Sequence, residues 1–92
     1  MQELTLTVRH KVGLHARPAA KFVKTAKSYN SQISITNLTR NSKTVDAKSL
    51  VGVVKIAVAC EHQIKLEIEG EDEQQAAEAL RTFIEEALEE QP

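Results

Sequence analysis

Three segments of the chain alternate apolar and polar residues with a period of two, and this pattern constrains the fold more than any other feature. They are residues 3–8 (ELTLTV), 32–38 (QISITNL) and 64–70 (IKLEIEG). Successive side chains of a β-strand point to opposite faces, so each segment predicts a strand with one covered face. A shorter strand is predicted at 44–47 (TVDA), returning from residues 32–38 as a hairpin. Four such strands predict one mostly antiparallel sheet with one face open to water.

Two longer segments repeat apolar residues at helical spacing. The first covers residues 16–28, and Pro18 suits its first turn because that turn does not use the missing N–H. The second covers residues 72–88, where Asp72 and Gln75 have the spacing of a capping box. Both segments therefore predict amphipathic helices that cover the sheet.

Residues 48–60 (KSLVGVVKIAVAC) are ambiguous. Their β-branched residues favour a strand, whereas Ser49 before an apolar run favours a helix N-cap. We adopt a short helix from Leu50 to about Lys55, for a further reason given below. The order β-α-β-β-α-β-α then predicts an α/β (α+β) fold, an open-faced two-layer β-sandwich whose four-stranded antiparallel sheet carries three helices on one face. The 92 residues contain no internal repeat or linker, so we expect a single domain over residues 1–92.

Composition argues against several classes of function. The only aromatic residues are Phe22, Tyr29 and Phe83. So few aromatic side chains offer little surface for stacking on nucleobases, and no nucleic-acid partner is expected. Cys60 is the only cysteine, which rules out an internal disulfide. No apolar run is long enough to span a membrane and the first residues lack a signal-peptide pattern, so we expect a cytoplasmic protein without a membrane partner.

The remaining histidines and the cysteine predict no site. We expect His10 and His62 to be surface residues, and Cys60 to be a small buried apolar residue. Scattered histidines with one cysteine lack the spacing of metal ligands, so no metal and no cofactor is expected.

The stretch GLHARPAAKF, from Gly13, places His15 directly before the first predicted helix. Free N–H groups and a partial positive charge at a helix start favour an anion. A phosphoryl group on the imidazole would provide the acceptor that a Ser or Asp cap normally supplies, and Arg17 adds donors to its oxygens. Imidazole is a good nucleophile near neutral pH when it is unprotonated. The alternative interpretation is an ordinary surface histidine or a moderate cap.

Charge is unevenly distributed along the chain. Residues 1–70 contain eleven Lys and Arg against five Asp and Glu, whereas residues 71–92 contain one against eight. Within the basic part, one helix face carries Arg17, Ala20, Lys24 and Lys27. This stripe predicts a docking surface for an acidic partner, with a merely solvated basic face as the alternative.

GLHARPAAKFVKTAK and AKSLVGV together closely resemble HPr, the histidine-containing phosphocarrier family of the bacterial sugar phosphotransferase system, over essentially the whole chain. The resemblance implies the open-faced sandwich, and with it the short helix after Ser49. It implies that the Nδ1 atom of His15 accepts a phosphoryl group from enzyme I, which phosphoenolpyruvate charges, and that Arg17 assists transfer. The acceptors would be the A-domains of the sugar-specific enzymes II. A carrier of this kind is a protein substrate in a relay rather than an independent enzyme. The sequence does not fix the oligomeric state, and a monomer is the default expectation.

Ser49 matches the serine that an HPr kinase/phosphorylase phosphorylates in many Gram-positive relatives. A phosphate at an N-cap would be stabilised by its helix and would add negative charge beside the docking face. The resemblance also implies exposed apolar contacts beside His15. The predicted partner interface is Ala16, Ala20, Lys24, Lys27, Leu50, Val51 and Val54.

Three other functions compete with a sugar phosphocarrier. One is a regulatory HPr-like binding module controlled by Ser49, although such a module has no need of the imidazole of His15. Another is a nitrogen-branch phosphocarrier, which differs in partner and not in chemistry. A small acyl-phosphate hydrolase is the third, but its Gly-x-Val-x-Gly-Val loop is absent. The chain departs from the family in a longer hairpin over residues 37–44 and in residues 59–63 (ACEHQ), which replace a glycine-containing turn.

Overall fold

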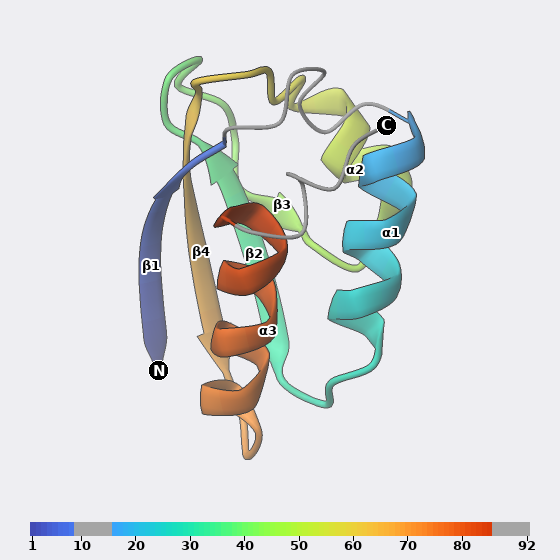
Figure 1. Ribbon diagram of the computed structural model, residues 1–92, viewed down its shortest axis with the longest axis vertical. Helices are drawn as coiled ribbons and strands as arrows, with labels where there is room; N and C mark the ends of the chain where they lie inside the picture. Colours follow the sequence, from blue (N-terminus) through green and yellow to red (C-terminus); the bar gives the residue numbers. More distant parts are fainter. Residues whose placement is uncertain (9–15, 86–92) are drawn as a thin grey trace.

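The computed structural model describes residues 1–8 and 16–85, apart from the side chain of Ala16. Seven elements follow in the order strand, helix, strand, strand, helix, strand, helix (Figure 1). They are β1 (Gln2–Thr7), α1 (Ala16–Lys27), β2 (Gln32–Asn37), β3 (Val45–Asp46), α2 (Leu50–Lys55), β4 (Gln63–Glu69) and α3 (Glu73–Glu85). The predicted order of elements is therefore confirmed.

The four strands form one sheet in the order β1-β4-β2-β3, and every neighbouring pair is antiparallel. Strand β4 is central, and its Leu66 lies opposite Leu4 of β1 and Ile35 of β2. The short β3 returns from β2 as the predicted hairpin, with Ile35 opposite Val45. Because side chains alternate along each strand, this register places the apolar members of the three long strands on one face.

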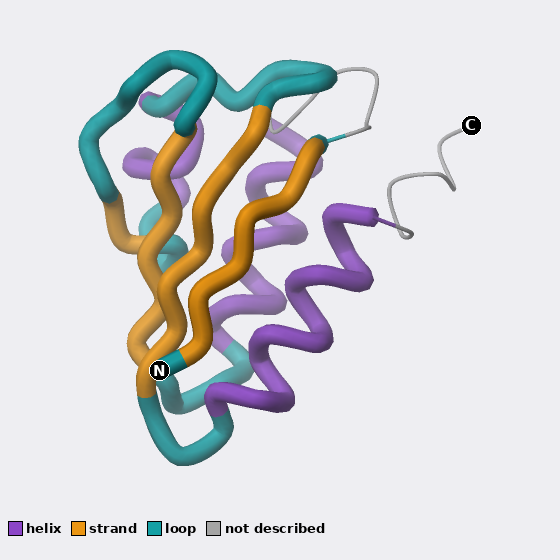
Figure 2. Tube along the Cα trace, turned by 90° about the vertical axis from the view of Figure 1, so that its left-hand side faces the viewer, coloured by secondary structure: helices purple, strands orange, loops and turns teal. Residues whose placement is uncertain are grey.

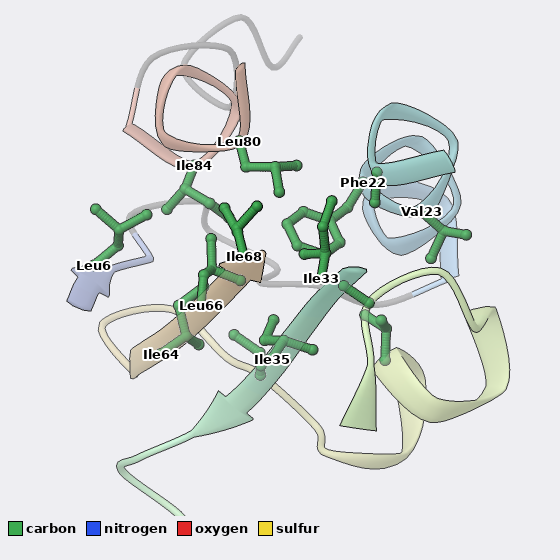
Figure 3. Packing of buried hydrophobic residues seen from close by; sticks show 14 of the residues in the cluster. Leu6, Phe22, Val23, Ile33, Ile35, Ile64, Leu66, Ile68, Leu80 and Ile84 are labelled. Atoms are coloured by element: carbon green, nitrogen blue, oxygen red, sulfur yellow. The ribbon is translucent and has the colours of Figure 1, made fainter. Parts of the chain in front are cut away.

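The helices lie on one face of the sheet, with α1 and α3 side by side and α2 packed against α1 and β3 (Figures 1 and 2). The core lies between these layers, where side chains of β2, β4, α1 and α3 meet (Figure 3). The ring of Phe22 meets that of Phe83 edge to face, with centroids 5.9 Å apart, which joins α1 to α3. The opposite face of the sheet carries polar side chains such as Glu3, Lys65 and Glu67. The predicted open-faced sandwich is therefore confirmed.

The ambiguous segment after Ser49 is a helix, as predicted. The Oγ atom of Ser49 accepts a hydrogen bond from the N–H of Gly52 at 3.1 Å, which is an N-cap contact. Val53 and Ile56 are buried three residues apart, a spacing that only a helix brings to one face. None of the helices in the described part of the chain is long and apolar enough to cross a membrane.

The capping box predicted for the last helix is wrong. The carboxylate of Asp72 accepts hydrogen bonds from the backbone N–H groups of Asn30 and Ser31 at 2.8 and 2.9 Å, and from the Ser31 hydroxyl. It thus fastens the loop after α1 to the start of α3. Instead the Glu73 carboxylate reaches back to the N–H of Gly70 at 3.1 Å. The helix ends at Glu85 within the described range, and its predicted continuation to residue 88 lies outside that range.

The segment before β4 differs from expectation at two side chains. His62 is half-buried and not a plain surface residue, since its Nδ1 atom accepts the N–H of Ala59 at 3.1 Å. Cys60 is only partly buried. The turn itself forms without glycine, with Ala57 at φ 52° and Glu61 at φ 74°. His10 lies outside the described residues.

Candidate functional site

Helix α1 begins at Ala16, the residue that directly follows His15 in the sequence. His15 itself lies outside the described residues. The first turn contains no acidic side chain, and Arg17 within it is exposed. Helix starts present N–H groups without intrahelical partners, so this turn has the donors and the cation that an anion requires.

The exposed side of α1 is basic. Ala20, Lys24 and Lys27 are exposed, as predicted for a stripe on one face, while the opposite side of the helix is buried in the core. Among residues 1–8 and 16–85 the only ion pair joins the Met1 amino group to Glu73, so Arg17, Lys24 and Lys27 have no carboxylate partner there. No carboxylate of the described residues therefore neutralises the positive charge of α1.

Helix α2 adds an apolar surface next to this basic side. Leu50, Val51 and Val54 are 44%, 68% and 42% exposed, which is high for large apolar side chains. The two helices are in contact, and α2 lies beside the first turns of α1 in Figure 1. The structure therefore brings together the α1 basic residues and the α2 apolar residues that the sequence analysis assigned to one interface. Of the predicted interface, only the side chain of Ala16 lies outside the described residues.

Lys48 positions Ser49 in a way that the sequence analysis missed. Its amino group donates to the carbonyl of Tyr29 at 2.8 Å, and its N–H donates to the Asp46 carboxylate at 2.9 Å. The first bond ties the segment that leads into α2 to the residues just after α1, and the second closes a turn within that segment. The contact between Lys48 and Asp46 has a local signal in the sequence, because an Asx-type turn joins an Asp side chain to the N–H two residues later. The first contact joins residues nineteen positions apart, which no local pattern reveals.

The groups with shifted pKa values lie elsewhere. Hydrogen bonds from Ser31 and the N–H of Asn30 lower the pKa of Asp72, and the hydrogen bond from the Met1 amino group lowers the pKa of Glu73. The same contact raises the pKa of that amino group. All of them sit at the end of the molecule where α3 starts, the lower end in Figure 1, whereas α1 starts at the upper end. These charges therefore stabilise the fold and take no part in the candidate site.

No set of three or more His, Cys, Asp or Glu side chains within the described ranges is arranged to hold a metal ion. The candidate site is a surface and not a cavity: an exposed helix start preceded by a histidine, flanked by lysines and an apolar patch. A basic stripe beside exposed apolar side chains is the kind of surface on which a partner of opposite charge docks.

Comparison with known proteins assigns the family. The family described as "PTS HPr component phosphorylation site" matches residues 2–86. The chain is 45% identical over 85 residues to the HPr-like protein Crh of Halalkalibacterium halodurans, covering 92% of this chain and 98% of that protein. It is also 45% identical over 80 residues to the multiphosphoryl transfer protein of Haemophilus influenzae, but that match spans only 16% of the relative and 87% of this chain.

Solved structures agree. A crystal structure of HPr-C-His from Thermoanaerobacter tengcongensis superimposes with a TM-score of 0.90 at 41% identity, covering both chains completely. The chain belongs to the HPr family of phosphocarriers. The fold class and the family that the sequence motifs indicated are thereby confirmed.

Proposed function

We propose that this chain is a single-domain carrier that accepts a phosphoryl group on His15 from phospho-enzyme I and passes it to the A-domains of enzymes II. One observation carries the proposal: α1 begins at the residue after His15, and its first turn offers an exposed Arg17 and no acidic side chain. The carrier would return to its starting state after each cycle and so act as a relay component, which we place in the cytoplasm.

The chemistry requires little beyond positioning and charge stabilisation. The unprotonated Nδ1 atom of His15 attacks the phosphorus of phospho-enzyme I, a P–N bond forms, and the bond to the donor breaks. In the second step the P–N bond breaks as the phosphoryl group passes from His15 to an enzyme II A-domain. N–H groups at the start of α1 and the guanidinium of Arg17 receive the phosphoryl oxygens, whose negative charge they stabilise.

Both partners would dock on the surface formed by α1 and α2. An exposed basic stripe attracts an acidic partner and speeds encounter, while exposed apolar side chains supply the contact that holds the complex. Lys24 and Lys27 fill the first role, and Leu50, Val51 and Val54 fill the second. The surface is shared, so enzyme I and an enzyme II would bind in turn, as a relay requires.

Ser49 would regulate this docking when an HPr kinase/phosphorylase modifies it. Its Oγ atom already accepts the N–H of Gly52, and a phosphate there keeps oxygen acceptors at the same helix start. The added negative charge lies next to Leu50 and Val51, within the proposed docking surface. Approach of an acidic partner to phosphorylated Ser49 is therefore opposed.

The test of the carrier is intact-mass analysis after incubation with phosphoenolpyruvate and enzyme I, repeated after brief acid treatment. We expect one added phosphate that acid removes, because a phosphoramidate bond is acid-labile. His15→Ala should abolish the addition, whereas His10→Ala, a change in the same segment, should leave it intact. Arg17→Ala should slow the transfer without altering the circular dichroism spectrum. Phosphorylation of the His15→Ala variant would overturn the site assignment.

A regulatory module is the second candidate, because the HPr-like protein Crh of Halalkalibacterium halodurans is 45% identical to this chain, against 39% for the phosphocarrier protein HPr of Cupriavidus necator. Incubation with ATP and an HPr kinase/phosphorylase would then add an acid-stable phosphate that Ser49→Ala abolishes. If only this phosphate appears, and enzyme I adds none, the chain is a regulatory module. If only the acid-labile phosphate appears, regulation at Ser49 is excluded for that kinase.

A further inference from the structure

One hollow is lined almost entirely by cations and apolar side chains, and none of its lining residues belongs to the proposed docking surface. It has a volume of about 350 Å³ and lies between the β2–β3 connection and the end of α2. The lining residues are Arg40, Ser42, Lys43, Val45, Lys55 and Ile56. Three positive side chains therefore border one small space that contains no acidic lining residue.

These three cations have no ionic partner within the described residues. The ion pair of Met1 with Glu73 is the only one there, and it does not involve this hollow. Asp46, which follows the lining residue Val45 in the sequence, accepts the N–H of Lys48 and is not among the lining residues. Like charges that border one space repel, and an anion bound in that space would lower the repulsion.

The walls of the hollow are held by one buried side chain. Asn37 is fully buried, and its Nδ2 atom donates to the carbonyl of Ile56 at 3.0 Å. Its Oδ1 atom accepts the N–H of Arg40 at 3.3 Å, and its N–H donates to the Ser42 hydroxyl at 2.8 Å. The side-chain amide and the backbone N–H of Asn37 together hold the connection that carries Arg40 and Lys43 against the end of α2. The backbone of the hollow is set before any ligand arrives, which lowers the cost of binding.

We propose that this hollow, which shares no described residue with the proposed phosphoryl-transfer surface, is an anion site that binds a diphosphate group. Three cations match the charge of about −3 that a diphosphate carries near neutral pH, and guanidinium and ammonium groups are the usual donors to phosphoryl oxygens. The volume lies at the lower end of the range for small-molecule sites. Val45 and Ile56 form an apolar part of the lining, which suits the organic portion of a nucleoside diphosphate. The proposal uses no residue of the proposed phosphoryl-transfer surface, so its test is independent of the test of the proposed function.

The test is a titration of the protein with inorganic pyrophosphate at low salt, followed by backbone amide NMR. We expect saturable shifts concentrated at Ser42, Lys43, Lys55 and Ile56. Arg40→Gln, Lys43→Gln and Lys55→Gln should each weaken binding about fivefold, the effect of one unit charge at contact distance in water. Lys21→Gln, which removes one exposed charge from α1, should leave the affinity unchanged.

Other outcomes would overturn the site. Comparable shifts along the basic side of α1, or equal weakening by Lys21→Gln, would show only a diffuse counter-ion atmosphere. Shifts confined to Arg17 and its neighbours would show that pyrophosphate prefers the start of α1, and a titration without saturation would show no site. A parallel titration with uridine diphosphate tests whether the site recognises a nucleotide or the diphosphate group alone. Tighter binding than pyrophosphate points to a nucleotide, and equal binding shows that the diphosphate alone is recognised.

Discussion

Removal of the Ser49 hydroxyl tests how much of α2 depends on a single cap. The helix has six residues, too few to be stable alone, and its Gly52 N–H has the Oγ atom of Ser49 as its acceptor at 3.1 Å. Ser49→Ala leaves that donor without its partner. Loss of an N-cap side chain costs about 1 kcal/mol of unfolding free energy, which is about a fivefold change in the ratio of folded to unfolded protein.

The measurement is urea unfolding followed by circular dichroism, together with the melting temperature. A loss of about 1 kcal/mol should lower Tm by about 4–8 °C in a domain of this size. Ser49→Asn is the matched control, since its side-chain oxygen also caps and it should stay within a few tenths of a kcal/mol of the wild type. The cap argument is refuted if Ser49→Ala is as stable as the wild type, or if Ser49→Asn is as destabilised as Ser49→Ala.

Substitutions at Ser49 also separate the effect of helix capping from the effect of charge on the binding of enzyme I. Ser49→Asp and Ser49→Asn both supply an acceptor to Gly52, and they differ by one negative charge. We expect Ser49→Asp to weaken binding of enzyme I and Ser49→Asn to have little effect, with a difference that shrinks as salt rises. Equal binding of the two variants would remove the electrostatic explanation for regulation.

Three further predictions concern contacts that hold the fold. Asp72→Asn should destabilise the protein at neutral pH: the folded-state pKa of Asp72 is lowered, so its contribution is present above the ordinary pKa of about 3.9 and is lost as pH falls through the lower folded value. Urea unfolding at several pH values should therefore show a difference from wild type that disappears in acid, and a difference independent of pH would contradict it. Gly70→Ala should cost about 2 kcal/mol in the same assay, because a Cβ there would lie 2.6 Å from the Cα of Ser31 and the backbone φ of 157° is unfavourable for a side chain. Asn37→Leu should cost about 3 kcal/mol, since it leaves the carbonyl of Ile56 and the N–H of Arg40 without their buried partner, and a loss below 1 kcal/mol would show that water replaces the amide.

The strands were predictable because their pattern is local. Alternation along residues 3–8, 32–38 and 64–70 is a property of each segment, and burial on one face follows from the pleat of any strand. The helix after Ser49 was not predictable from the residues alone. Its β-branched composition suits a strand, and the resemblance to the family decided the prediction that the cap at Ser49 and the burial of Val53 confirm.

The candidate site was predictable in chemistry and only partly in geometry. The types and order of residues in GLHARPAAKF indicate a phosphoryl site, and the assignment of His15 stays a prediction because that residue lies outside the described ranges. The predictions for Asp72 and His62 were wrong because both side chains bond to residues far away in the sequence. Asp72 bonds to a loop 41 positions earlier in the chain, and the Nδ1 atom of His62 lies 3.1 Å from the Nδ2 atom of Asn37, 25 positions earlier.

By itself the sequence determined the period of each element, the basic face of α1 and the family, because these depend on neighbours within a turn or a strand, or on a short motif. Only the tertiary structure decided which polar groups would be paired. Asn37 became the link between two loops, and Lys48 the link to the segment that ends α1. The cations Arg40, Lys43 and Lys55 border one hollow and form no ion pair with any carboxylate of residues 1–8 or 16–85. A buried or partly buried polar group takes whatever partner the packing brings within hydrogen-bonding distance, and packing is a property of the whole chain.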